Sequence, residues 1–85
     1  MKATLEFDLN DSDDRMAHLR AVKSLDMACA IFQICYNTKK GLEYELEGKE
    51  ERGEEVSAYD AVHMTMEKIH NVFDSYGINI DELLN

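Results

Sequence analysis

Apolar and polar residues alternate over the first nine positions of the chain. The apolar residues are Ala3, Leu5, Phe7 and Leu9. A period of two places their side chains on one face of an extended segment, so the pattern predicts a β-strand over residues 2–9 with one buried face. Because a single strand is not stable alone, this one needs a partner strand.

The period changes to that of a helix after a short polar run. Asp11 or Ser12 is suited to cap the helix, and Asp13 and Asp14 place negative charge at its positive end. The pattern predicts a helix over residues 13–37 with a heptad-like apolar stripe. The stripe consists of His18, Val22, Leu25, Cys29, Phe32 and Tyr36. In its second half most of the circumference is apolar, so more than one neighbouring element must cover the helix.

The signal weakens in the connection over residues 38–54. Leu42, Tyr44 and Leu46 alternate with glutamates, which permits a short second strand over residues 42–46. Leu42 and Leu46 are also four residues apart, which permits a helical turn. We expect a mainly non-helical, acidic and solvated connection that contains a short extended piece.

The clearest helical pattern covers residues 55–76. Its apolar residues are Tyr59, Val62, Met66, Ile69, Phe73 and Tyr76. Gly77 is expected to end the helix in the left-handed conformation, with Ile78 packing back onto it. Asn79 lies three residues before Glu82, a capping-box spacing, which predicts a C-terminal turn over residues 79–85.

These elements predict a mainly α single domain over residues 1–85, built as an antiparallel αα-hairpin with a short N-terminal β-strand. The strand pairs either with residues 42–46 or with a strand from another copy. Chains of this size bury only about 60–68% of their surface. Together with the two-sided apolar helix, this predicts a homo-oligomer, either a dimer or a larger assembly.

Net charge excludes one large class of function. The chain has 9 Lys and Arg residues against 18 Asp and Glu residues, which gives a formal charge of −9. This argues against direct nucleic-acid binding, which requires cations that contact phosphates. Apolar runs are too short for a membrane helix. Cys29 and Cys35 lie too far apart in one helix to form a disulfide, and two free thiols suit a reducing cytoplasm.

Segments at both ends of the chain resemble a group of small bacteriophage and prophage proteins. They are Lys2 to Leu9, Asp13 to His18 and Tyr76 to Leu84, whereas residues 39–55 have no counterpart. The resemblance implies a viral accessory protein that acts in the host cytoplasm by binding. Small acidic accessory proteins of phages often inhibit host defence, as anti-CRISPR proteins do, and this is the activity that we expect. The resemblance implies no catalytic residue.

Catalytic and metal-binding patterns are weak. His63, Glu67 and His70 follow one helix face, and Glu67 and His70 have the spacing of helical-bundle di-metal sites. Such a site needs further carboxylates, and beyond its first turn the first predicted helix offers only Asp26. We therefore expect no metal and no cofactor. The chain also lacks a nucleophile motif and a phosphate-binding loop, so we expect no enzyme activity.

Two binding mechanisms remain, one for each sign of charge. The acidic residues Glu43, Glu45, Glu47, Glu50 and Glu51 form a candidate surface for a basic host protein, which is the leading hypothesis. Arg15, Arg20 and Lys23 form the alternative, a pocket that gathers at an oligomer interface and sequesters an anionic nucleotide signal. A small helical metal-binding protein is the second alternative.

Overall fold

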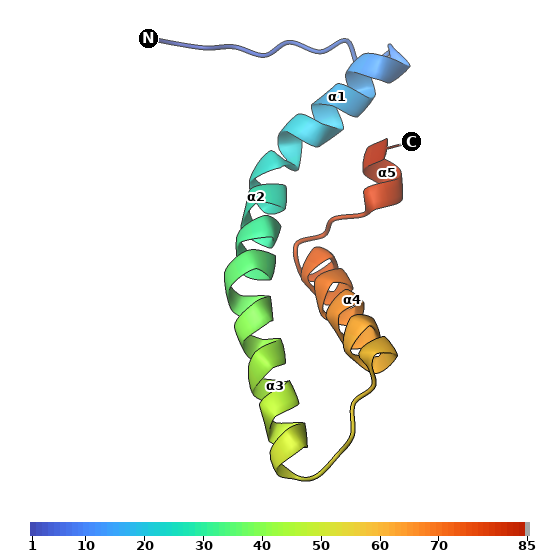
Figure 1. The fold of residues 1–85 in the computed structure, drawn as a ribbon. Coiled ribbons are helices and arrows are strands. Elements are labelled where there is room, and N and C mark those ends of the chain that lie inside the picture. Colours follow the sequence, from blue (N-terminus) through green and yellow to red (C-terminus); the bar gives the residue numbers. More distant parts are fainter. Residues whose placement is uncertain (85) are drawn as a thin grey trace.

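Helices make up most of the chain in the computed structural model, which describes residues 1–84 (Figure 1). In chain order they are α1 (Ser12–Val22), α2 (Ser24–Phe32), the π-helix η1 (Gln33–Thr38), α3 (Lys39–Glu51), α4 (Ala58–Ser75) and α5 (Ile80–Leu84). The predicted mainly helical class is confirmed. Asn85, which the predicted C-terminal turn includes, lies outside the described residues.

The helices α1, α2, η1 and α3 follow one another almost directly and form one long, bent rod (Figure 1). The prediction of a non-helical connection is therefore wrong as far as Glu51, and residues 42–46 are helical rather than a strand. Leu42 is buried, and Lys39 pairs with Glu43 one turn along the helix at 3.6 Å. A four-residue spacing of apolar and of oppositely charged residues stabilises a helix, and it outweighs the alternation here.

The π-helix keeps the buried side of the rod in line. Across η1 this side follows a four-residue spacing through Ala30, Ile34, Thr38 and Leu42. In an α-helix, residues four apart are separated by about 400° around the helix axis. Such a row therefore shifts by about 40° around the axis at each step. The wider turn of a π-helix reduces that drift. As a result Leu42, like Ala30, is buried.

Helix α4 runs back along the rod, antiparallel to α3 (Figure 1). Hydrogen bonds cap both of its ends. At the start, Ser57 Oγ accepts from the Asp60 N–H at 3.1 Å and the Asp60 carboxylate accepts from the Ser57 N–H. At the end, Gly77 has a φ of 66°, and the Ile78 N–H donates to the Phe73 carbonyl at 2.8 Å. Both predictions for this end, a left-handed Gly77 and a buried Ile78, are confirmed.

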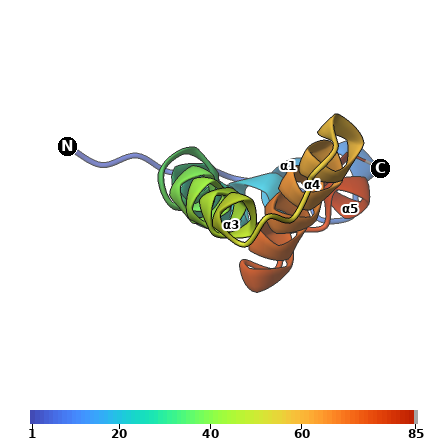
Figure 2. The same cartoon turned by 60° about the horizontal axis from the view of Figure 1, so that its bottom comes forward.

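The core is small and lies at one end of the hairpin. It contains Ala30, Ile78 and Leu83, surrounded by partly buried apolar side chains from α1, α2 and the end of α4. Helix α5 begins where the Asn79 side chain accepts from the Glu82 N–H at 3.1 Å, as its capping spacing predicted. Helix α4 packs chiefly on η1 rather than on α3. The hairpin is therefore open towards its loop, as the view from that end shows (Figure 2).

The predicted N-terminal strand does not form in the single chain. Within residues 1–84 there is no β-strand, and the first eight residues run as an extended arm (Figure 1). The intramolecular partner considered for it, residues 42–46, is part of α3. The end of the arm is held on α1, because Phe7 meets His18 edge-on at 5.5 Å and the Asp8 N–H donates to Asp14.

The helices are also too short or too polar for a bilayer. In residues 1–84 none combines the length and the apolar character that crossing a membrane requires.

Candidate functional site

Four glutamates gather on one side of α3 and form an acidic face, defined as Glu43, Glu47, Glu50 and Glu51. At 100° per residue they fall within a sector of about 100° around the helix axis. All four are exposed. Glu43 lies 3.6 Å from Lys39, whereas the other three make no ion pair in residues 1–84. A rigid helix thus presents three uncompensated carboxylates to solvent.

Glu45 does not belong to this face, although the sequence placed it there. It lies about 200° around the helix from Glu43. Its carboxylate is 3.5 Å from Nζ of Lys68 on α4. The structure therefore brings together four of the five predicted acidic residues and uses Glu45 in the contact between α3 and α4.

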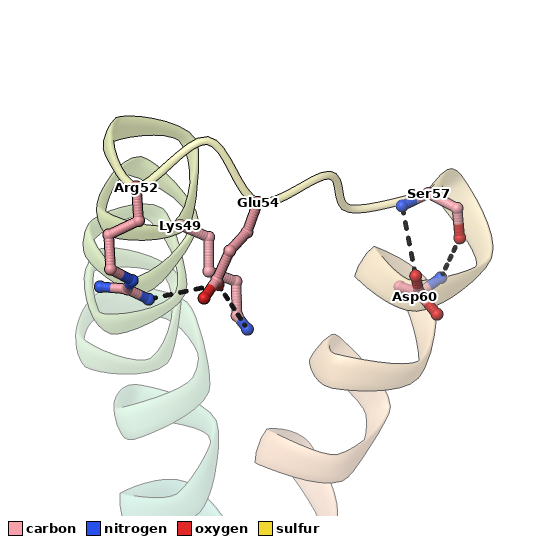
Figure 3. Close-up of polar contacts among 5 residues, drawn as sticks. All are labelled: Lys49, Arg52, Glu54, Ser57 and Asp60. Atoms are coloured by element: carbon pink, nitrogen blue, oxygen red, sulfur yellow. Dashed lines mark hydrogen bonds and ion pairs between the residues drawn. The ribbon is translucent and has the colours of Figure 1, made fainter.

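Arg52 and Lys49, which are close in sequence to Glu50 and Glu51, pair with Glu54 instead. The Glu54 carboxylate lies 3.4 Å from Arg52 and 3.6 Å from Lys49 (Figure 3). The hydrogen bond and positive charge of Arg52, assisted by Lys49, lower the pKa of Glu54 below its ordinary value. Both cations face the turn that leads to α4, so they leave Glu50 and Glu51 uncompensated.

The three candidate cationic residues differ in what they contact. Arg20 Nε donates to the Leu83 carbonyl of α5 at 2.8 Å. The Lys23 ammonium lies 3.4 Å from where a Cβ on Gly77 would sit, just beyond the end of α4. Carbonyls at helix C-termini lack intrahelical partners and carry partial negative charge, so Arg20 stabilises the end of α5. Arg15 is exposed and lies about 140° around the helix from Arg20.

The three weak candidates for metal ligands on α4 do not converge on a site. His63, Glu67 and His70 are all exposed. The ring of His70 lies against Phe73, with 6.4 Å between centroids. Among residues 1–84 no three His, Cys, Asp or Glu side chains are placed to hold a metal ion.

The structure also shows a polar groove that the sequence did not indicate. The groove has a volume of about 670 Å³ and runs between η1 and α4. Its polar lining residues are Gln33, Asn37, Thr38, Lys68, Asn71, Ser75 and Tyr76. Gln33 accepts a hydrogen bond from Asn37 at 2.6 Å, so part of this lining is satisfied within η1. The four-residue spacings of Gln33 with Asn37 and of Asn71 with Ser75 are the sequence signals that would have revealed it.

Comparison with known proteins gives no further identification. No protein family matches the chain, and no curated protein or solved structure is significantly similar to it.

Proposed function

We propose that the chain is a non-enzymatic binding protein whose acidic face captures a basic protein of a bacterial host. In this proposal it is a phage-type accessory protein that acts in the host cytoplasm as a homo-oligomer and inhibits a host defence protein. The observation that carries the proposal is the acidic face itself. Glu47, Glu50 and Glu51 are exposed on a helix and have no cation partner in residues 1–84.

Charge and position both support a role in recognition. The net charge of −9 attracts basic proteins over a distance of about one Debye length, roughly 8 Å at physiological ionic strength. Complementary charge raises the rate of association and selects among partners. A helix holds the carboxylates in fixed positions, so a basic partner meets a prearranged surface rather than a mobile loop.

The alternative, sequestration of an anionic nucleotide, receives less support. Arg20 donates a hydrogen bond to α5 within the same chain, and the Lys23 ammonium lies near Gly77, just beyond the end of α4. Binding a phosphate with these cations would have to compete with those contacts. The metal-binding alternative has no converging set of ligands in residues 1–84.

Neutralising the acidic face tests the proposal. The variant with Glu43, Glu47, Glu50 and Glu51 changed to Gln removes four charges and keeps the size of each side chain. We expect immobilised wild-type protein to retain basic proteins from a bacterial lysate at low salt and to release them at high salt. The variant should retain at least tenfold less, because three or four charge pairs of a few tenths to 1 kcal/mol each are lost.

A second variant separates the acidic face from net charge. Changing Glu6, Glu55 and Glu67 to Gln and Asp74 to Asn also removes four exposed negative charges, but none lies on α3. This control should bind like the wild type. Equal loss in both variants would show a general effect of net charge, and no retention of basic proteins by the wild type would contradict the proposal.

A further inference from the structure

The predicted apolar stripe of the first helix faces away from the core. Phe32 and Leu25 lie about 200° and 220° around the helix from the buried Ala30. We define the outward stripe as Val22, Leu25, Phe32 and Tyr36. These side chains are exposed by 62%, 73%, 56% and 58%. The intramolecular core therefore uses a different side of the helix and leaves four of the six residues of the heptad-like stripe exposed, whereas His18 and Cys29 are half-buried.

The surface between the stripe residues carries no charge. On the helix, Ala21, Ala28 and Cys29 lie between them, and all three are small. Phe32 and Tyr36 stack on one another with 4.8 Å between ring centroids. An uncharged, apolar patch with aromatic residues is typical of a protein interface and costly to leave in water.

The single chain exposes more surface than a compact monomer of its mass, and the excess is similar to the area that a subunit buries in a homodimer. The chain exposes 7072 Å², whereas a compact monomer of 9.8 kDa exposes about 5,200 Å². Its radius of gyration is 18.2 Å, against about 12 Å for a compact domain of this length. The excess of about 1,900 Å² per chain lies within the range that obligate homodimers bury, about 1,000–2,500 Å² per subunit.

The N-terminal arm extends on the same side of the molecule as the outward stripe. In both ribbon views its tip points away from α4 and α5, so it projects beyond the face of the rod opposite the core (Figures 1 and 2). Ala3 and Leu5 are exposed and alternate with polar residues. The first six residues can span about 20 Å when extended. That is enough to reach across a helix packed on the stripe, since packed helices lie about 8–10 Å apart.

We propose that the outward stripe is the interface with a second copy of the chain, packed antiparallel about a twofold axis near Cys29, with each N-terminal arm lying on the partner subunit. The twofold axis passes near Cys29 because it is the midpoint between Val22 and Tyr36. The proposal rests on the homo-oligomeric state included in the proposed function, but it does not require that the acidic face binds a basic protein.

Repulsion between the acidic faces favours an antiparallel over a parallel orientation of the two copies. A parallel pair would place the two acidic faces on α3 side by side, and like charges in that position repel each other. An antiparallel pair directs the two α3 helices to opposite ends of the dimer.

Light scattering and substitution of Phe32 test the interface. We expect the wild type at micromolar concentration to have twice the 9.8 kDa mass of the chain. Phe32→Glu should weaken self-association on the order of 1,000-fold, because a central aromatic residue contributes about 2 kcal/mol or more and enters a symmetric interface twice. A wild-type monomer would contradict both the assembly and this interface.

A matched variant and a fold measurement make the result decisive. Tyr59→Glu changes an aromatic residue that is 89% exposed near the start of α4, outside the stripe, and it should remain dimeric. Both variants should keep their helical circular dichroism, because both positions are exposed in the single chain. If the Phe32→Glu variant remains a dimer, the outward stripe is not the interface, although the protein still forms an oligomer.

The native cysteines give a test that does not depend on the stability of Phe32→Glu. In Cys35→Ser, the remaining Cys29 should form an intermolecular disulfide on mild oxidation, because facing helices at 8–10 Å bring their Cα atoms within disulfide range. In Cys29→Ser, Cys35 should crosslink at least tenfold less. The reverse order would contradict the proposed axis.

Orientation is tested in a chain without native cysteines. Val22→Cys and Tyr36→Cys variants should crosslink only when they are mixed, because an antiparallel pair brings position 22 of one copy to position 36 of the other. Crosslinking of each variant with itself would instead show a parallel dimer.

Discussion

At the scale of single residues, the charge of Glu54 is stabilised by two neighbouring cations. Arg52 and Lys49 lower its pKa, so we expect its carboxyl to titrate below the ordinary value of a glutamate in an NMR pH series. Because the folded pKa is lowered, the contribution of Glu54 to stability is present above its unfolded pKa and is lost as the pH falls through the folded value.

Removing the cation provides the control for Glu54. Arg52→Gln should return the pKa of Glu54 most of the way to its ordinary value, since Arg52 is the largest cause of the shift. An unchanged titration of Glu54 in this variant would contradict the assignment of the cause.

Two glycines are predicted to respond in opposite directions to alanine. Gly77 has a φ of 66°, so Gly77→Ala should destabilise the protein by about 1–2 kcal/mol in urea unfolding. Gly41 lies inside α3, and a Cβ added there would meet nothing within 4 Å, so Gly41→Ala should stabilise the protein by about 0.5–1 kcal/mol. The same sign for both variants would contradict the helical position of Gly41 or the left-handed turn at Gly77.

At the scale of elements, the π-helix leads us to expect that a single-residue deletion destabilises the protein less in η1 than in α2. Deleting Asn37 from η1 removes a residue from the wide turn, so the helix can tighten towards α geometry while Leu42 keeps its side. Deleting the exposed Ala28 from α2 instead rotates one end of the rod by about 100° relative to the other. We expect the Ala28 deletion to destabilise by about 4 kcal/mol or more and the Asn37 deletion by clearly less.

Thermal unfolding followed by circular dichroism measures the two deletions. Equal losses of melting temperature would show that η1 is not what aligns the buried row. A less destabilising Ala28 deletion would contradict the register described here.

The structure of the elements also explains why residues 42–46 form a helix although their pattern permits a strand. Residues 42–46 satisfy a period of two and a spacing of four at once. The alternation predicted a strand, but the ion pair of Lys39 with Glu43 and the burial of Leu42 belong to a helix. A strand here would have had no neighbour within the chain, because the N-terminal arm is anchored on α1.

At the scale of the whole molecule, the distribution of apolar surface and charge divides the rod into two parts. The residues from 22 to 36 present the uncharged outward stripe, and α3 presents the acidic face. The proposed antiparallel dimer covers the first and places the two acidic faces towards opposite ends of the dimer. Such a dimer would offer a basic partner two separate acidic faces, which raises apparent affinity when the partner has two sites.

The sequence alone determined the features that depend on local spacing. The caps at Asp11, Ser57 and Asn79, the left-handed Gly77 and the helical periods are short-range, because the hydrogen bonds that satisfy them lie within a few residues. Tertiary structure decided which side of each helix is buried. Ala30 rather than Phe32 enters the core, because α4 and α5 return to that side. It also decided that Arg20 contacts α5, because a partner 63 residues away cannot be inferred from local sequence.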